Sequence, residues 1–404
     1  MLEPWLTRAA RSRPQHEALR SPDRSLSYAE LLEAAREAAG GMRGARMAGI
    51  ALPPGEDFAV TLHACLLTGV TAVPVDLRLG QAEQAHVTAG CDVVLDARPS
   101  GPPADPRPFA QDEPAIVVHT SGTSGTPKRV ALSYGNWLWS ALGAHVAMGL
   151  GPDERWLCAL PLSHVGGLSI LVRSAIYGTT AIVHGRFDAE RVLAEEFSVV
   201  SVVPTTLSRL LDAGGRDFTA LLGGAPVAPA LLERAAEHGV RAIETYGLTE
   251  ACSQVTVDGR PLFCTRVALA ADGEIVVEGP TVAAGPLHTG DLGAFDAEGR
   301  LRIAGRKADT IVTGGENVAP AEVEAVLEAH PAVAEAAVHA APDPDWGEAV
   351  VATVVLRTGA DAAPEELLEF AREHLAGFKV PKRLSFAASL PRTPSGKLLR
   401  RELV

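Results

Sequence analysis

The sequence predicts an α/β protein with a large N-terminal domain and a small α+β C-terminal domain. Strand-like and helix-like segments alternate between residues 50 and 245, which is typical of doubly wound sheets. From Gly259 this alternation gives way to short strand-like segments separated by turn residues, which predicts a small β-subdomain. The composition changes again after Gly305, so we expect domains at residues 1–305 and 306–404.

The first hundred residues predict part of a parallel sheet. Residues 4–20 are expected to be helical, and Ser27 with Glu30 has the pattern of a capping box that opens a helix ending near Ala39. Another helix is expected at residues 57–67. Three short apolar segments are typical of strands: residues 50–52, 72–75 and 91–95. Because helices separate these strands, we expect them to be parallel.

The alternation resumes after residues 97–114, which contain six prolines and are expected to form a linker or loop. Strands are expected at residues 115–118, 156–160, 181–184, 199–203, 220–222 and 242–245. Helices are expected at residues 134–148, 166–177, 188–196, 205–212 and 229–238. This order predicts a doubly wound domain, in which ligands bind at the carboxyl ends of the strands.

The last third of the chain predicts two smaller parts. Residues 273–278 and 299–303 are strand-like, with turn residues between them, and predict a small antiparallel or barrel-like subdomain. Beyond residues 305–309, where we expect the domain boundary, a compact α+β unit follows. Its helices are expected at residues 320–330 and 364–375, and its strands at residues 333–341 and 350–356.

Composition excludes several classes of protein. The 404 residues are 47% hydrophobic, enough for a large core, and the net charge of −13 argues against a nucleic-acid binder. Five scattered cysteines without a CxxC pair indicate neither a disulfide framework nor a zinc site. The N-terminus lacks the apolar core of a signal peptide, and no run approaches the ~18 apolar residues of a membrane span. We therefore expect a soluble cytoplasmic protein with no membrane insertion.

The segment VHTSGTSGTPKRV, residues 118–130, follows a buried strand and has the composition of a polyphosphate-binding loop. Its glycines let backbone N–H groups approach an anion, its hydroxyls are donors, and Lys128 adds a positive charge. It is not a Walker A loop, because the GK[ST] ending is missing. A Gly/Ser/Thr turn with a solvated lysine is the alternative. The candidate residues are Thr120, Ser121, Gly122, Thr123, Ser124, Gly125, Thr126 and Lys128.

The segment ETYGLTE, residues 244–250, follows a predicted strand and combines an aromatic ring, a hydroxyl and a carboxylate. Tyr246 can stack on a base, Thr249 can contact a phosphate and Glu250 can hold Mg²⁺. A strand-to-helix turn with an N-cap threonine explains the segment at least as well. Upstream, a strand ends in three small residues that leave room for a planar ring or form a plain turn: Gly223, Gly224 and Ala225.

Three further positions carry charged side chains on turns. Asp291, in His288-Thr289-Gly290-Asp291, is suited to the two hydroxyls of a ribose. Arg306 lies at the expected domain boundary, where it can reach ribose or phosphate. Lys397 ends the Pro/Gly-rich segment PRTPSGK. Each position alone is explained as well by ordinary surface chemistry.

Taken together, the motifs VHTSGTSGTPK, YGLTE, TGD, GRKAD…GGENV and PRTPSGK resemble the adenylate-forming superfamily of acyl-CoA ligases, luciferases and peptide-synthetase adenylation domains. The five motifs agree in order and rough spacing and extend over nearly the whole chain. Within the superfamily, LPLSHVGGLSILVRSAIYGTT, SVVPTTLSRLL, LLGGAP and ETYGLTEACSQV resemble the o-succinylbenzoate–CoA ligases of menaquinone biosynthesis.

The resemblance implies an enzyme that uses ATP, Mg²⁺ and coenzyme A to activate a small-molecule carboxylic acid, with a mobile C-terminal lid and a possible homodimeric state. The acid first becomes an acyl-adenylate and then a thioester. Lys397 would bridge the acid and the α-phosphate, Thr249 would contact the α-phosphate, and Glu250 would hold Mg²⁺. Residues Thr120–Lys128 would hold the β- and γ-phosphates. The other implied contacts are adenine for Gly223, Gly224, Ala225, Tyr246 and Gly247, ribose for Asp291 and Arg306, and coenzyme A for Gly314, Gly315 and Glu316.

Two features depart from the family pattern. The hinge position two residues after Arg306 usually holds Asp or Lys, but here it holds Ala308, with Asp309 next. That puts the charged contacts of the hinge in question, although not the rotation of the lid. The chain is also short for the family, with thin segments near residues 40–115, so we expect a trimmed N-terminal subdomain.

The pocket for the acid is predicted from four residues. His164 matches a family position near the acyl carboxylate, with a hydrogen-bonded core histidine as the alternative. Arg173 interrupts an apolar helix, where an unpaired charge is costly. Its partner is expected to be either the second carboxylate of a diacid substrate or an Asp or Glu of the protein. Ser253 and Gln254 are expected to line the same pocket.

The predicted function is therefore an ATP-dependent ligase that joins coenzyme A to an aromatic diacid, o-succinylbenzoate. One alternative is another aryl- or medium-chain acyl-CoA ligase. A second is a non-catalytic AMP/ATP-binding homologue, which would be expected to lose the lysines that are present here, Lys128 and Lys397. An amino-acid adenylation domain fits less well, because the His164 region has no carboxylate to pair a substrate ammonium.

Overall fold

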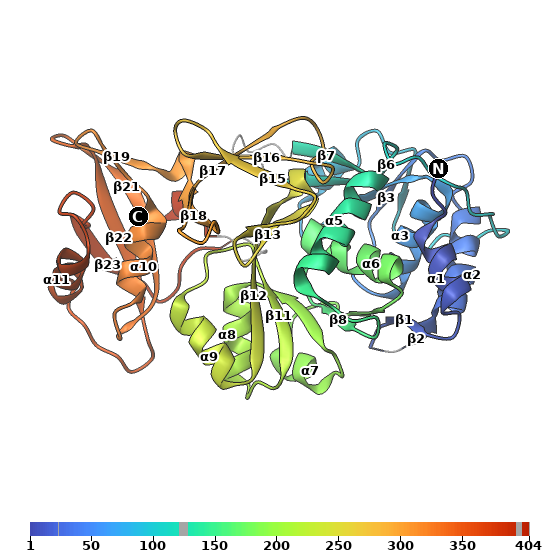
Figure 1. Cartoon of the computed structure of the whole chain (residues 1–404), viewed down its shortest axis with the longest axis horizontal. Helices are drawn as coiled ribbons and strands as arrows, with labels where there is room; N and C mark the ends of the chain where they lie inside the picture. Colours follow the sequence, from blue (N-terminus) through green and yellow to red (C-terminus); the bar gives the residue numbers. More distant parts are fainter. Residues whose placement is uncertain (23, 121–127, 393–397, 404) are drawn as a thin grey trace. The chain divides into compact units, whose positions relative to one another are not determined.

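The computed structural model describes residues 1–22, 24–120, 128–392 and 398–403. They form two compact units (Figure 1). The first comprises Met1–Gly223, Ala235–Arg266 and Val277–Leu287, and the second comprises Gly224–Arg234, Val267–Val276 and His288–Val404. Helices and mostly parallel sheets make up the first unit, so the predicted α/β class is confirmed. The division of the chain at residues 305 and 306 stays a prediction.

A nine-stranded sheet with the order β14-β13-β12-β11-β10-β8-β9-β1-β2 forms one half of the first unit. Its central strands are parallel: β1 (Glu17–Arg20), β8 (Arg155–Cys158), β9 (Thr180–Val183), β10 (Val199–Val202), β11 (Phe218–Leu222) and β12 (Val240–Leu248). All residues of β9 and β10 are buried, as expected of parallel strands covered on both faces. Antiparallel strands lie at the two edges: β2 (Ser25–Ser27), β13 (Ser253–Val257) and β14 (Arg260–Pro261).

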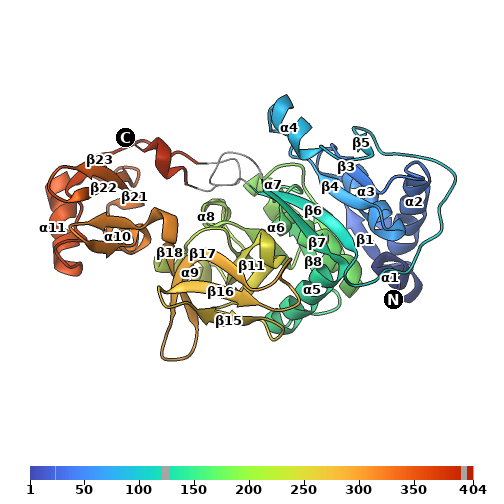
Figure 2. The same cartoon turned by 90° about the horizontal axis from the view of Figure 1, so that it is seen from above.

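A second sheet of the first unit has the order β5-β3-β4-β6-β7 (Figure 2). Its parallel strands are β3 (Met47–Ile50), β4 (Thr71–Pro74), β5 (Val93–Leu95) and β6 (Pro114–Thr120). The last strand, β7 (Lys128–Ser133), runs antiparallel to β6. One hydrophobic core contains residues from both sheets and from the helices that pack on them, so the two sheets form one packed body.

The helices of this unit contact one another through buried apolar faces. Figure 1 shows α5 and α6 packed side by side, next to α1, α2 and α3. Helix α5 begins at a Ser133–Asn136 capping box and ends at Gly149, which has a φ of 63°. The helices are α1 (Trp5–Ser12), α2 (Tyr28–Gly40), α3 (Glu56–Thr68), α4 (Gln81–Val87), α5 (Tyr134–Met148), α6 (Val165–Tyr177), α7 (Ala189–Ala194) and α8 (Pro204–Asp212). Helix α9 (Pro229–Glu237) belongs to the second unit up to Arg234.

Three expectations for this part of the chain were wrong or incomplete. The helix predicted over residues 4–20 ends at Ser12, because the following Arg13 precedes Pro14 and is disfavoured in helical conformation. Residues 17–20 instead form β1, which pairs with β9 in the sheet. Helix α4 and strand β7 were not predicted.

The motif at residues 244–250 is also placed differently from the prediction. Strand β12 continues to Leu248, so Tyr246 and Gly247 lie inside the strand and not after it. A single 3₁₀ turn, Thr249–Ala251, then leads into the antiparallel strand β13. Thr249 is the first residue of this turn and does not act as an N-cap, so the N-cap alternative was wrong.

The C-terminal part of the chain contains two smaller sheets. A four-stranded sheet with the order β15-β16-β17-β18 accounts for the predicted β-subdomain. Its strands are β15 (Arg266–Leu269), β16 (Glu274–Glu278), β17 (Leu287–Phe295) and β18 (Leu301–Arg306). The 3₁₀ turn Lys307–Asp309 follows β18.

The last hundred residues form a five-stranded sheet covered by two helices. Helix α10 (Pro320–Glu328) and helix α11 (Pro364–His374) each begin with proline at the first helical position. Apolar residues of the helices and strands form a separate hydrophobic core. The strands are β19 (Ile311–Thr313), β20 (Glu316–Val318), β21 (Val333–Asp343), β22 (Gly347–Leu356) and β23 (Arg383–Phe386).

The cysteines and the helix lengths can be compared with what the composition predicts. All five cysteines are unpaired, as expected from their scattered positions. In the described ranges, every helix is too short or too polar to span a lipid bilayer.

Candidate active site

The two ends of the predicted polyphosphate segment lie opposite each other. Strands β6 and β7 are antiparallel, with Thr120 paired with Lys128, and Thr120 Oγ1 donates to the Lys128 carbonyl over 3.5 Å. Lys128 Nζ lies 3.6 Å from Glu250 Oε1. The structure therefore brings together two residues that the sequence assigned to separate motifs. The candidates Ser121, Gly122, Thr123, Ser124, Gly125 and Thr126 lie outside the described residues.

The turn that carries Thr249 and Glu250 is strained and held from both sides. Cys252 and Ser253 have φ angles of 53° and 90°, which cost non-glycine residues about 1–2 kcal/mol each. Ser140 Oγ of α5 donates to the Cys252 carbonyl over 2.6 Å. The Ala283 N–H donates to the Glu250 carbonyl over 2.8 Å. Strain of this kind persists only where neighbouring structure fixes the backbone, and it is common at ligand sites.

Two glycines allow close approach of backbone at the ends of β11 and β12. A Cβ on Gly247 would lie 1.7 Å from the carbonyl oxygen of Ser253, so a larger residue cannot occupy this position without moving β13. A Cβ on Gly223 would lie 2.8 Å from Thr245 Oγ1. Thr245 Oγ1 in turn donates to the Leu222 carbonyl over 2.8 Å. The adjacent candidate Gly224 has a φ of 81°, and Ala225 follows it in a bend.

Arg173 is a buried cation with few polar contacts. Its exposed fraction is 2%, its Nη2 donates to Ser140 Oγ over 3.1 Å, and its guanidinium lies 5.9 Å from the centroid of the Trp156 ring. Its Nε is buried without a partner, and burial lowers the pKa of the guanidinium. Within the described part of the chain, no carboxylate lies within 4 Å of it, so the structure gives no support to the alternative of a structural salt bridge.

The other candidates for the acid pocket lie on elements that contact each other. His164 immediately precedes α6, and burial lowers the pKa of its ring, an effect that the nearby Asp76 carboxylate opposes. Gln254 is 5% exposed, and its Oε1 is buried without a partner. Ser253 is one of the two strained residues of the turn. Because β13 contacts both α5 and α6, Gln254 and Arg173 are placed on neighbouring elements.

In the second unit, Asp291 of β17 and Arg306 of β18 are paired. They are in register across the two strands, and Arg306 Nε lies 2.6 Å from Asp291 Oδ1. Asp291 is 5% exposed and its backbone N–H donates to Thr289 Oγ1 over 3.1 Å. The ionised pair is a charge-assisted hydrogen bond that fixes the carboxylate on the strand.

Gly314 and Gly315 form the turn between β19 and β20. Their φ angles are 59° and 84°, both in the left-handed region that favours glycine. A Cβ on Gly314 would lie 2.6 Å from the Trp346 ring, whereas a Cβ on Gly315 would meet no atom within 4 Å. Glu316, which follows, is exposed. The backbone at Gly315 is therefore open to a ligand, and that at Gly314 is covered.

The expected hinge position lies in a short turn that is bonded to the C-terminal segment. Ala308 lies inside the 3₁₀ turn Lys307–Asp309, and Asp309 Oδ2 accepts a hydrogen bond from Arg400 Nη1 over 3.4 Å. The charge beside the hinge position is thus carried by Asp309. Lys397 lies outside the described residues.

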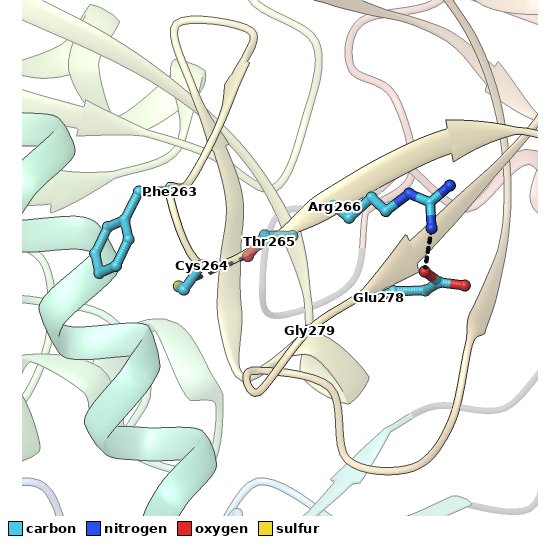
Figure 3. A pocket seen from close by; sticks show the side chains of 6 residues that line it. All are labelled: Phe263, Cys264, Thr265, Arg266, Glu278 and Gly279. Atoms are coloured by element: carbon cyan, nitrogen blue, oxygen red, sulfur yellow. Dashed lines mark hydrogen bonds and ion pairs between the residues drawn. The ribbon is translucent and has the colours of Figure 1, made fainter.

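A surface hollow of about 430 Å³ contains none of the candidate residues (Figure 3). Figure 3 shows Arg266 turned toward Glu278, with which it forms an ion pair at 3.2 Å, while Phe263 points away from this pair. Phe263 is 61% exposed. The charges of the hollow are already paired with each other, so it offers no free charge to a nucleotide.

The described part of the chain contains no cluster of three or more His, Cys, Asp or Glu side chains that could hold a metal ion. A nucleotide-bound Mg²⁺ needs fewer protein ligands, because it is usually held by one or two carboxylates together with phosphates and water. Glu250 fits this requirement, since its side chain is 22% exposed and its nearest ionic partner is one lysine at 3.6 Å.

Comparison with known proteins gives matches along most of the chain. A family model described as AMP-binding enzyme matches residues 6–97 and 93–285, and one described as AMP-binding enzyme C-terminal domain matches residues 322–397. The chain belongs to the AMP-binding enzyme family. This member is 35% identical to a 2-succinylbenzoate–CoA ligase of Bacillus licheniformis, with 99% of this chain and 98% of the relative covered.

Solved structures of the family are similar over the whole chain. The o-succinylbenzoate coenzyme A synthetase of Bacillus subtilis in complex with its acyl-adenylate intermediate has a TM-score of 0.90 at 33% identity, with 99% of this chain and 98% of that one covered. The same synthetase in complex with ATP and magnesium ion has a TM-score of 0.91 at 33% identity, with coverage of 100% and 99%. The predicted membership of the adenylate-forming superfamily is therefore confirmed.

Some functional contacts could not be found by reading motifs. Ser140, which bonds both Arg173 and the Cys252 carbonyl, is an ordinary residue of an apolar helix in the sequence. Asp76 and Ser163 are hydrogen-bonded to each other but lie in different segments; Asp76 belongs to no motif, and Ser163 belongs to a motif in which it gave no sign of its partner. Only the tertiary structure places these side chains beside the candidates.

Proposed function

We propose that this AMP-binding enzyme is an ATP-dependent ligase that joins 2-succinylbenzoate to coenzyme A, as a step of menaquinone biosynthesis. The relative in Bacillus licheniformis has this activity in its name, and the Bacillus subtilis synthetase is seen with the adenylate of the same acid. Both cover nearly the whole of this chain, so the proposal concerns the complete reaction and not a single domain of it.

The observation that carries the choice of acid is the burial of Arg173. A buried guanidinium that has no carboxylate partner among the described residues has an uncompensated charge, which is strongly destabilising. The guanidinium contacts only the Ser140 hydroxyl and the face of the Trp156 ring among the described residues. These contacts replace only part of the hydration that it would have in water. The second carboxylate of a diacid would supply the missing anion. Gln254, buried nearby with an unpaired oxygen, would accept a hydrogen bond from the same substrate or its water.

The proposed reaction has two steps. A carboxylate oxygen of the acid attacks the α-phosphorus of ATP, the bond to the β-phosphate oxygen breaks, and acyl-adenylate and pyrophosphate form. The thiolate of coenzyme A then attacks the acyl carbon, and AMP leaves with the electron pair of the broken C–O bond. The first step brings two anions together, so it requires positive charge at the transition state.

The residue roles follow from this requirement. Lys128 is assigned to the β- and γ-phosphates, Thr249 to the α-phosphate, and Lys397 to the bridge between acid and α-phosphate. Mg²⁺, bound with ATP, would neutralise charge on the phosphates, and Glu250 would hold it. While ATP is absent, the ion pair between Lys128 and Glu250 keeps both charges compensated.

The remaining assignments concern the nucleoside and coenzyme A. Tyr246 and Gly247, with the small residues Gly223 to Ala225, are assigned to adenine. Asp291 is assigned to the ribose hydroxyls, with Arg306 fixing the carboxylate. Gly314, Gly315 and Glu316 are assigned to the pantetheine arm, for which the open side of Gly315 leaves room.

The proposal extends to location and assembly. A cytoplasmic location is proposed because ATP and coenzyme A, both consumed by the reaction, are supplied there. A homodimer is proposed from the same family resemblance, and sedimentation of the purified chain tests it.

The decisive experiment is ATP–pyrophosphate exchange with a panel of acids, followed by coenzyme A ligation. The panel contains 2-succinylbenzoate, its mono-acid analogues, medium-chain fatty acids and amino acids. We expect exchange to be fastest with 2-succinylbenzoate and a thioester to form when coenzyme A is added. Preferred exchange with a mono-acid would support another acyl-CoA ligase instead. Absence of exchange with every acid would contradict the proposal and favour a non-catalytic homologue.

A further inference from the structure

A hydrogen bond joins two loops that follow strands of different sheets in the first unit. Asp76 follows β4 of the five-stranded sheet, and Ser163 lies between β8 of the nine-stranded sheet and helix α6. Ser163 Oγ donates to Asp76 Oδ2 over 3.1 Å. Both loops leave the carboxyl ends of parallel strands, where ligands of α/β proteins bind. The Asp76–Ser163 bond therefore lies at the edge where substrate is expected.

Asp76 is itself held in a fixed position. Its Oδ1 accepts hydrogen bonds from the Arg78 backbone N–H over 3.1 Å and from Arg78 Nε over 2.8 Å, and its Oδ2 accepts from Arg78 Nη2 over 2.5 Å. The side chain is 16% exposed. These bonds to Arg78 lower the pKa of the carboxyl to about 2. Asp76 is therefore ionised across the physiological range and is always available to accept the Ser163 hydroxyl proton.

Ser163 is next to His164, the N-cap residue that immediately precedes α6. The His164 backbone is bonded at both ends, since its N–H donates to the Pro161 carbonyl over 3.2 Å and its carbonyl accepts from the Leu168 N–H over 3.0 Å. In contrast, its ring makes no hydrogen bond to another described residue. The direction of the ring therefore depends on the backbone of residues 161–164, which the Ser163 bond ties to the other sheet.

Helix α6 also carries Arg173, so this helix and the residue before it hold two of the residues predicted to line the acid pocket, Arg173 and His164. We infer that Asp76 and Ser163 are positioning residues for the acid substrate, because the bond between them fixes the start of α6 and with it the His164 ring. This inference rests on the proposed function. It requires no contact between substrate and Asp76 or Ser163, and that distinguishes it from a direct binding role for the serine.

The test is a double-mutant cycle on the acid half-reaction. Ser163→Ala, Asp76→Ala and the double variant are compared with the parent by pyrophosphate exchange, using the acid from the panel that the parent uses best. Each single change should lower kcat/KM for the acid roughly 10- to 100-fold, as expected for a small misplacement of binding groups, and should leave the KM for ATP unchanged. The double variant should have about the same kcat/KM for the acid as the less active single variant, because both changes break the same bond.

Conservative variants separate positioning from folding. Ser163→Thr keeps the hydroxyl and should restore most of the activity lost in Ser163→Ala. If Asp76→Ala does not fold, Asp76→Leu takes its place, because leucine has a similar shape and no acceptor oxygen for the Ser163 hydroxyl. Thermal unfolding of each variant shows whether the fold is intact.

The chain offers a matched serine–carboxylate pair as a control. Ser198 Oγ donates to Glu154 Oε2 and accepts from the Arg155 N–H over 2.9 Å. These residues directly precede β10 and β8, so the pair lies at the amino ends of the nine-stranded sheet. Ser198→Ala and Glu154→Ala should change thermal stability and leave the KM for the acid at the parent value.

Several outcomes would overturn the inference. A loss in Ser163→Ala without one in Asp76→Ala would mean that the serine binds substrate directly. Additive losses in the double variant would also contradict it. So would a rise in the KM for ATP as large as that for the acid, or a rise in the KM for the acid in the control variants as large as that in the Ser163 and Asp76 variants. Failure of the proposed function is distinguishable, because the parent would then prefer another acid or show no exchange before any variant is compared.

Discussion

At the scale of single residues, Arg173 is a cation whose contacts are unusually few for its burial. Among the described residues, one hydroxyl and one ring face meet a side chain that has five N–H donors, and its Nε finds no acceptor there. The bond from Ser140 also links the guanidinium to the strained turn after Glu250, since the same hydroxyl donates to the Cys252 carbonyl. Binding of an anion at Arg173 is therefore connected, through one serine, to the turn that carries the proposed Mg²⁺ ligand.

Arg173→Ala tests the pairing with a second carboxylate. A hydrogen bond to a charged group contributes about 1.5–3 kcal/mol, so kcat/KM for 2-succinylbenzoate should fall roughly 10- to 200-fold. Mono-acid analogues should be affected little or accepted better, because the unpaired charge is gone. The measurement is kcat/KM for a diacid and its mono-acid analogue in parent and variant.

Arg216 is a matched control for this change. Its guanidinium lies 4.3 Å from the centroid of the Phe197 ring, and its Nε is also buried without a partner, but it belongs to no candidate site. Arg216→Ala should leave the ratio between the two acids unchanged. Parallel losses for both acids in Arg173→Ala, together with a large loss of stability, would show a structural role for Arg173.

Lys397 has a predicted role that depends on the sequence motif alone, because it lies outside the described residues. Lys397→Ala should abolish formation of the adenylate and leave thioester formation from supplied acyl-adenylate largely intact. A positioned charge at such a transition state contributes about 3–4 kcal/mol, or about 10²–10³ in rate. Single-turnover measurements of the two half-reactions check this. Adenylate formation at the parent rate would refute the assignment.

The sequence predicted side chains that belong to motifs, and it missed those whose role depends on a neighbour in space. Thr249, Glu250 and Lys128 were predicted as site residues because their types and order are specific, but the 3.6 Å contact between Lys128 and Glu250 was not predicted. Ser140 gave no signal at all, since a serine in an apolar helix is usually unremarkable. Residue type can be read from one segment, whereas a bond between distant segments cannot.

At the scale of elements, the turn between β19 and β20 contains two glycines in different surroundings. Gly314 is covered by the Trp346 ring, and its N–H donates to the Trp346 carbonyl over 2.9 Å. Gly315 has open space on the side where a side chain would project. A side chain at Gly314 would therefore disturb the folding of the turn, whereas a side chain at Gly315 would mainly obstruct the access of a ligand to the backbone.

Gly315→Leu should slow the coenzyme A step and leave pyrophosphate exchange at the parent rate. Bulk at this open position would block passage of the pantetheine arm along the backbone. Gly359→Leu is the matched control, because Gly359 also has a positive φ, 79°, and no atom within 4 Å of an added Cβ. It carries the same backbone strain without the proposed contact. Equal losses in both half-reactions of Gly315→Leu would indicate misfolding and not a role in coenzyme A binding.

Elements were predicted well where local signals agree with tertiary packing. Helix α5 has the predicted bounds because Ser133 and Asn136 cap its start and Gly149 ends it. Residues 4–20 were predicted as one helix, although Pro14 disfavours a helical conformation at Arg13, and the pairing of β1 with β9 cannot be seen in a local pattern. Strand β12 was predicted too short, because its last residues are stabilised by β13 across a turn that the sequence does not reveal.

At the scale of the whole molecule, the second unit contains a group of buried and partly buried acids that makes stability depend on pH. Burial raises the pKa of Glu328 from 4.5 to about 7, an effect to which the neighbouring Glu324 and Glu335 add and which Arg392 opposes. The folded state therefore binds a proton between pH 4.5 and 7 that the unfolded state does not. The free energy of unfolding should fall as pH rises through this window.

Glu328→Gln removes this effect while keeping an acceptor for the Ala336 N–H. The variant should match the parent below about pH 4.5 and be more stable above pH 7, by roughly 2–3 kcal/mol as an upper value. Thermal and urea unfolding between pH 4 and 9 measure the difference. A constant difference at every pH would contradict the argument.

The five unpaired cysteines have a practical consequence for spectroscopy of this enzyme. Cys65, Cys158 and Cys252 have no exposed surface, and burial raises the pKa of the first two thiols to about 12 and that of the third further still. Burial also raises the pKa of the partly exposed Cys91 and Cys264. Because only the thiolate reacts quickly with maleimide dyes, the native thiols should label slowly at neutral pH. One cysteine added to the surface of each unit would then carry a fluorophore pair, and energy transfer between the two dyes would report domain motion during turnover without removal of any buried thiol.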